Sequence, residues 1–126
     1  MKFQPDTTSG VNLITRRDSD RLWVGSTPYA HSVLVPWVGD VLPWHAAAMR
    51  ELSAAHFQRI LALRPKLVIF GSGALLRFPP PEMLRALIDQ GIGVETMDTA
   101  AACRTYNVLV SEHRSAVAAL LVESAP

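Results

Sequence analysis

The chain has 126 residues and a formal net charge of +1, because it contains twelve Lys and Arg and eleven Asp and Glu. Apolar residues make up 49% of the chain and charged residues 18%, which excludes a disordered protein and predicts one globular domain over residues 1–126. The basic residues are scattered, with Arg16–Arg17 as the longest run, so we expect no nucleic-acid partner.

The first half of the chain carries short strand patterns. Apolar and polar residues alternate over Val11–Thr15, and Arg21–Gly25 follows the turn Asp18–Asp20, as in a β-hairpin. A third strand is predicted over Tyr29–Val35. Prolines and glycine then interrupt the pattern from Pro36 onward, which predicts loops.

The second half changes to helical periodicity. A helix is predicted to begin after Ser53, a suitable N-cap, and to end at Pro65. The apolar run within Lys66–Phe70 is typical of a strand covered on both faces. Pro79–Pro81 opens a further helix, and Gly91 is the expected residue after its end.

The last quarter of the chain predicts a strand, a helix and a final strand. The strand covers Gly93–Met97, Asp98 or Thr99 caps the helix, and the apolar run Ala116–Val122 favours the final strand. The strand–helix–strand order from Lys66 onward implies a right-handed parallel crossover. The pattern therefore predicts an α/β sandwich with a β-rich N-terminal half.

Cysteine content and hydropathy indicate the compartment. The single cysteine, Cys103, excludes an internal disulfide and any Cys-x-x-Cys motif, which favours a reducing environment. No apolar run approaches the roughly 20 residues that span a bilayer. Met1–Asp6 lacks the features of a signal or transit peptide. We expect a soluble, cytoplasmic protein without a transmembrane segment.

Two parallel strands that end at the same edge of a sheet predict a site at that edge. The glycines after one strand allow backbone N–H groups to face a ligand. The helix that starts after the other strand offers free N–H groups, and an arginine adds a forked cation. A small anion such as phosphate or carboxylate fits this chemistry. The candidate ligand-binding residues are Gly71, Ser72, Gly73, Asp98, Thr99 and Arg104.

A purely structural interpretation of the same residues stays open. The Gly71–Gly73 turn is too short for a phosphate-loop signature, and turns of this composition are common. Asp98 is an ordinary helix cap whose carboxylate would compete with a bound anion for the same N–H groups.

Two further side chains have both a chemical and a structural interpretation. Glu95 lies mid-strand in an apolar context, and a buried glutamate needs a partner, so we expect a structural ion pair between Glu95 and Arg104. Cys103 is predicted near a helix N-terminus on the core side. That position can activate a thiol, but burial makes cysteine an inert hydrophobe, which is the commoner case.

The remaining residues do not form a complete catalytic or metal-binding set. The four histidines lack metal-ligand spacing, so we expect no metal and no cofactor. Trp23, Trp37 and Trp44 are expected to pack the core, although the loop around Trp37 would expose a tryptophan as a contact residue. Because no complete catalytic set is visible, a non-catalytic role is favoured.

Several segments together resemble a known family. They are Leu67–Gly73, Phe78–Pro81, Gly91–Leu109 and Glu112–Arg114. The chain resembles small bacterial and archaeal proteins of unknown function whose mitochondrial relative is an assembly factor for respiratory complex I. The resemblance implies a three-layer α/β fold with a mixed central sheet, no established activity, no known cofactor and a protein partner. The signature residues that it covers in the last quarter are Glu95, Asp98, Arg104, Thr105, Tyr106 and Asn107.

Two functional hypotheses follow. The first is a non-catalytic protein-interaction domain that aids assembly of a respiratory or other membrane complex and exposes apolar residues such as Leu75–Leu76. The second is a small-anion or metabolite-binding protein or enzyme that uses the crevice at Gly71–Gly73 and Asp98–Arg104. Arg104 distinguishes them, since it pairs with Glu95 under the first hypothesis and points into a pocket under the second.

Overall fold

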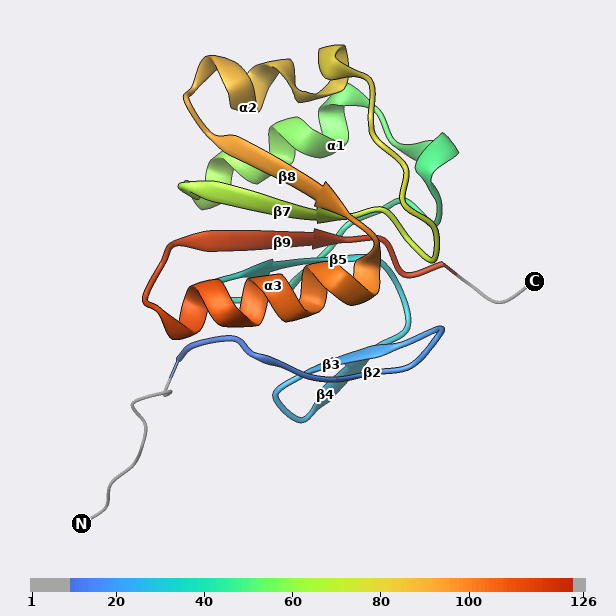
Figure 1. Cartoon of the computed structure of the whole chain (residues 1–126), viewed down its shortest axis with the longest axis vertical. Coiled ribbons are helices and arrows are strands. Elements are labelled where there is room, and N and C mark those ends of the chain that lie inside the picture. The colour runs from blue at the N-terminus through green and yellow to red at the C-terminus, as the bar shows by residue number, and fades with distance from the viewer. Residues whose placement is uncertain (1–9, 124–126) are drawn as a thin grey trace.

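The computed structural model describes residues 10–123 (Figure 1). Met1–Asp6, on which the expectation about targeting rests, lies outside the described residues. The strands are β2 (Ile14–Arg17), β3 (Leu22–Val24), β4 (Thr27–Tyr29), β5 (Val33–Pro36), β6 (Leu42–Pro43), β7 (Leu67–Gly71), β8 (Gly93–Met97) and β9 (Ala116–Leu120). The helices are α1 (Ala54–Gln58), α2 (Arg85–Asp89) and α3 (Thr99–Ser111), with 3₁₀ turns over Met49–Glu51, Arg59–Leu63 and Pro81–Leu84.

The strands form a central sheet and a smaller second sheet. The central sheet has the order β6-β5-β9-β7-β8, in which β7 runs parallel to β8 and β9, and β5 runs antiparallel to β9. Strands β2, β3 and β4 form a separate antiparallel sheet. The mixed central sheet, the parallel β7–β8 pair, the hairpin and the final strand confirm the predicted topology.

Helices and the small sheet cover the two faces of the central sheet (Figure 1). Helices α1 and α2 lie on one face, and α3 together with β2–β4 lies on the other. Val68, Ile69 and Phe70 of β7 are fully buried, because this strand is covered on both sides. The three-layer α/β class is therefore confirmed.

Helix α3 joins the small sheet to the central one. The Asp98 carboxylate caps the helix by accepting from the Ala101 N–H at 2.8 Å. Farther along, the buried Tyr106 hydroxyl lies 2.8 Å from the Asn12 carbonyl, to which it donates. The Asn107 side chain accepts from the Ile14 N–H at 2.9 Å and donates to the Ile14 carbonyl at 2.7 Å. These bonds fix the first strand of the small sheet against the helix.

The structure corrects two expectations in the first half of the chain. The strand expected over Val11–Thr15 begins only at Ile14. The strand expected over Tyr29–Val35 is two strands in different sheets, because the chain leaves β4 and enters β5 at Ser32. The buried Ser32 hydroxyl accepts from the Val122 N–H at 2.9 Å, which holds this crossing against the end of the last strand.

Candidate functional site

The carboxyl ends of β7 and β8 lie side by side, as the sequence predicts. The Ser72 N–H donates to the Met97 carbonyl at 2.9 Å, and the Thr99 N–H donates to the Gly73 carbonyl at 2.9 Å. The glycine turn and the start of α3 therefore share one edge of the sheet, which we call the rim.

Thr99 connects the segments of the rim. Its buried hydroxyl accepts from the Gly73 N–H at 2.9 Å and donates to the Leu121 carbonyl at 2.8 Å, just beyond β9. A Cβ on Gly71 would lie 2.9 Å from the Thr99 hydroxyl oxygen, which is closer than real Cβ atoms come. The close approach of Thr99 therefore explains why glycine stands at position 71.

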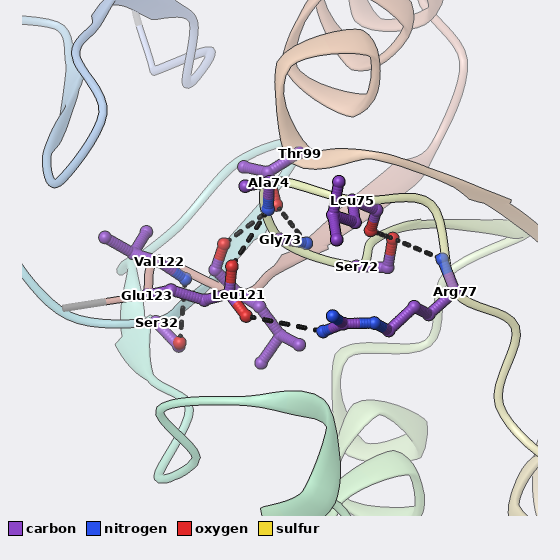
Figure 2. Close-up of polar contacts among 10 residues, drawn as sticks. All are labelled: Ser32, Ser72, Gly73, Ala74, Leu75, Arg77, Thr99, Leu121, Val122 and Glu123. Carbon is purple, nitrogen blue, oxygen red and sulfur yellow. Dashed lines mark hydrogen bonds and ion pairs between the residues drawn. The ribbon is translucent and has the colours of Figure 1, made fainter. Parts of the chain in front are cut away.

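Glu123 closes the rim, and the sequence did not single it out. Its carboxylate accepts from the Ala74 N–H at 2.9 Å, and its second oxygen lies 3.9 Å from the Arg77 guanidinium (Figure 2). Gly73 has φ of +104°, and a Cβ there would lie 2.6 Å from the carboxylate. The position of Glu123 just after the last parallel strand is the signal that would have found it, because parallel strands end at the same edge.

The buried Ser72 hydroxyl holds the loop that follows. It donates to the Leu75 carbonyl at 2.8 Å and accepts from the Arg77 N–H at 3.1 Å (Figure 2). This loop, residues 74–78, is exposed throughout and is called the apolar loop below. Its large apolar side chains, with exposed fractions of 60%, 54% and 70%, are Leu75, Leu76 and Phe78.

A cleft of about 510 Å³ lies between the rim and the turn that joins β2 to β3. Of the candidate ligand-binding residues, Gly73, Asp98 and Thr99 line it. The described residues that line the cleft do not include the other candidates, which are Gly71, Ser72 and Arg104. The turn adds two cations that the sequence did not predict at this place, Arg17 and Arg21.

The electrostatics of the cleft are unfavourable for an anion. Four carboxylates line it, which outnumber the two guanidinium groups, and one guanidinium already pairs with a carboxylate, since Arg21 lies 3.6 Å from Asp18. Three of the N–H groups at the rim, those of Gly73, Ala74 and Ala101, already donate within the chain, to Thr99, Glu123 and Asp98. Most polar groups of the rim thus bond to one another. The four carboxylates belong to Asp18, Asp20, Asp98 and Glu123.

The expectation that Glu95 is buried is wrong. Strand β8 is an edge strand of the central sheet, so Glu95 is exposed, and Arg104 is exposed on α3. None of the ion pairs among residues 10–123 joins these two side chains.

Cys103 is buried against the core rather than presented at the rim. Burial raises the pKa of its thiol to about 11, although Arg17 and Arg104 act in the opposite direction. Burial likewise raises the pKa of the Tyr106 hydroxyl. A thiol that stays protonated is a poor nucleophile, so the geometry favours a packing role for Cys103.

The described part of the chain contains no group of three His, Cys, Asp or Glu side chains placed to hold a metal ion. Within residues 10–123, no helix is both long and apolar enough to span a bilayer.

The sequence of the chain is similar to those of several known proteins. The 13 kDa major membrane protein of Francisella tularensis subsp. holarctica (strain LVS) is 33% identical over 67 residues, which are 53% of this chain and 54% of that protein. The NADH dehydrogenase (ubiquinone) 1 alpha subcomplex assembly factor 3 of Danio rerio is 32% identical over 99 residues, 77% of this chain and 56% of that protein. The chain thus spans about half the length of these relatives.

A solved structure and a family model agree with this placement. The crystal structure of a Bordetella parapertussis protein matches with a TM-score of 0.86 at 32% identity, covering 90% of this chain and 98% of that one. The model described as "Protein of unknown function (DUF498/DUF598)" matches residues 14–121. The predicted resemblance is confirmed, and the chain belongs to the DUF498/DUF598 family, with complex I assembly factors among its relatives.

Proposed function

We propose that this chain is a non-catalytic interaction domain that aids assembly of a respiratory or other membrane complex, acting from the cytoplasm. Its similarity over 77% of its length to a protein called an NADH dehydrogenase assembly factor supports this role. The proposed partner is a protein component of such a complex.

One observation in the structure carries the proposal. The polar groups of the rim bond to one another, while Leu75, Leu76 and Phe78 are more than half exposed beside them. Large apolar side chains gathered on one loop are typical of a contact surface rather than of a reacting centre. The rim residues, in this interpretation, position the apolar loop.

Removal of the gene from the source organism tests the role in assembly. We expect less assembled NADH dehydrogenase in the membrane, measured by native electrophoresis with an activity stain, while its separate subunits are still made. The wild-type gene returned on a plasmid should restore the complex. An unchanged amount of assembled membrane complexes in the deleted strain would contradict the proposal.

The alternative function is binding of a small anion or metabolite in the cleft beside the rim. Its test is a calorimetric titration of the whole chain with inorganic phosphate. Saturable binding that Arg17→Ala or Arg21→Ala abolishes would favour it, because both side chains line the cleft. Arg104→Ala is the matched control, since Arg104 is an exposed arginine on the neighbouring helix. We expect no saturable heat.

A further inference from the structure

Strand β8 forms one margin of the central sheet (Figure 1). It is five residues long, whereas β6 at the opposite margin has two residues. Gly93 and Glu95 of β8 are exposed and its other residues are half-buried, while every residue of β9 in the middle of the sheet is buried. The outer side of such an edge strand carries backbone N–H and C=O groups that another strand can bind.

The backbone groups of β8 divide between its two sides. The Met97 carbonyl accepts from the Ser72 N–H at 2.9 Å, so the backbone of Met97 faces β7, as does that of Glu95 two residues earlier. Val94 and Thr96 alternate with them and direct their N–H and C=O groups away from the sheet. No backbone hydrogen bond among residues 10–123 occupies these outward groups. Four groups are therefore available to a partner strand.

Glu95 is the one charged residue of β8, and it is exposed. It lies on the face of the sheet that α3 covers, because it pairs in register with Ile69, which packs on that face. None of the ion pairs among residues 10–123 involves Glu95, so its carboxylate is not matched by Arg104 or by another cation of the described chain. A residue that an added strand places opposite Glu95 would contact this carboxylate.

A second copy of the chain fits this edge poorly. Antiparallel pairing through all four free groups sets Val94 opposite Thr96 of the other copy. The same register sets two Glu95 side chains opposite each other, with Cβ atoms about 4.5–5.5 Å apart, where like charges repel. A shift toward the start of β8 would use the Ile92 N–H, which already donates to the Leu87 carbonyl at 3.0 Å. A shift the other way reaches the start of α3, where the strand has ended.

We propose that β8 binds an extended segment of a partner protein, which adds a strand to the central sheet and places a Lys or Arg opposite Glu95. Hydrogen bonds to the backbone of Val94 and Thr96 hold the segment, and the Glu95 carboxylate selects its basic residue. Glu95 thereby disfavours a second copy and favours a basic partner segment. The inference rests on the proposed function, because it names the kind of segment that the interaction domain binds.

A nuclear magnetic resonance titration of the whole chain with a synthetic peptide tests the inference. The probe is acetyl-Thr-Val-Thr-Lys-Thr-Val-Thr-amide, and a comparison peptide has Glu in place of Lys. In the free chain, the amides of Val94 and Thr96 should exchange hydrogen fast and the amide of Glu95 slowly. The Lys peptide should shift the Val94 and Thr96 signals saturably and slow their exchange. The Glu peptide should bind at least about threefold more weakly.

Two variants separate the backbone contacts from the charge contact. Thr96→Pro removes an N–H that bonds nothing within the described chain, so the variant should fold and lose at least about tenfold in affinity for the Lys peptide. Thr96→Val is the matched control, because it keeps the N–H and should bind as the wild type does. Urea denaturation checks that both fold. Glu95→Lys should bind the Glu peptide more tightly than the Lys peptide, which tests the inference even if Thr96→Pro does not fold.

The inference is overturned if the Lys peptide leaves the Val94 and Thr96 signals unchanged, if both peptides bind the wild type equally, or if folded Thr96→Pro binds like the wild type. Sedimentation of the wild type tests the other occupant. Dimers that Thr96→Pro abolishes would assign the edge to a second copy and would also overturn the inference. If the peptide fails to bind while the wild-type gene still restores the assembled complex in the deleted strain, the edge is not the contact and the proposed function stands.

Discussion

The Glu123 carboxylate occupies the space where a side chain at position 73 would lie. A methyl group at position 73 would meet a left-handed backbone, with φ of +104°, and the Glu123 carboxylate at 2.6 Å. We predict that Gly73→Ala lowers the free energy of unfolding by about 2–3 kcal/mol, measured by urea denaturation. Gly39→Ala is the control, because Gly39 has nearly the same φ, +103°, and open space around it. It should cost only about 1–2 kcal/mol, the backbone strain alone.

A double-mutant cycle separates the clash from the backbone strain. In a chain that carries Glu123→Ala, the cost of Gly73→Ala should fall toward the cost at Gly39, because the side chain that the added methyl group would strike is gone. Equal costs of Gly73→Ala with and without Glu123 would show that the carboxylate does not lie where the rim network places it.

Cys103 gives the chain a predictable loss of stability in alkali. The folded-state pKa of its thiol, about 11, lies above the ordinary value of 9.0, so the folded state holds the proton more tightly. The protonated thiol makes its full contribution to the free energy of unfolding below about pH 9. This contribution falls as the pH rises from about 9 toward about 11. Between about pH 8 and pH 10 the loss should be about 1.4 kcal/mol in urea denaturation.

Cys103→Ala tests this assignment. Tyr106 also has a raised pKa and weakens the fold at still higher pH in both chains, so the difference between wild type and variant isolates the thiol. The variant should show a flatter dependence of stability on pH. In the wild type, iodoacetamide at about pH 8 should modify the folded thiol roughly 100-fold more slowly than the unfolded one. Rapid modification of the native chain would refute burial of the thiol.

At the scale of elements, α3 holds the small sheet through one amide. Asn107 makes two hydrogen bonds to the backbone of Ile14, at 2.9 and 2.7 Å. We predict that Asn107→Ala costs about 1–3 kcal/mol, because it leaves both backbone groups of Ile14 without a side-chain partner. Hydrogen exchange should show faster exchange at Ile14, while amides of β7 and β9 keep their protection.

Ser111→Ala provides the comparison on the same helix. The exposed Ser111 hydroxyl donates only to the Asn107 carbonyl one turn earlier, so its loss should change stability by less than about 0.5 kcal/mol. If Ser111→Ala and Asn107→Ala cost the same, the side-chain amide does not fasten the sheet to α3.

At the scale of the whole molecule, the sequence predicts those helices and strands whose formation depends on residues close to one another in the chain. The apolar run from Leu67, the cap at Asp98 and the glycine at position 91 each reflect nearby residues, and each element forms as predicted. The adjacency of the Gly71–Gly73 turn and Asp98 follows from one further rule, the parallel crossover.

The features that could not be predicted from the sequence depend on the order of the strands in the sheet. Glu95 is exposed because β8 lies at the edge of the sheet, and the order of strands is not encoded near Glu95. Glu123 reaches the Gly73–Ala74 turn because β9 lies beside β7, a pairing between segments about 50 residues apart. Arg17 and Arg21 line the cleft because the small sheet folds over the rim.

In the proposed function, the rim presents the apolar loop and does not itself bind a reacting ligand. Complementation of the deleted strain with two variants tests it most directly, with assembled NADH dehydrogenase in the membrane as the measurement. One variant replaces Leu75, Leu76 and Phe78 by serine, and the other carries Arg17→Ala and Arg21→Ala in the cleft. We predict that the loop variant fails to restore the complex and that the cleft variant restores it. Restoration by the loop variant together with failure of the cleft variant would contradict the claim.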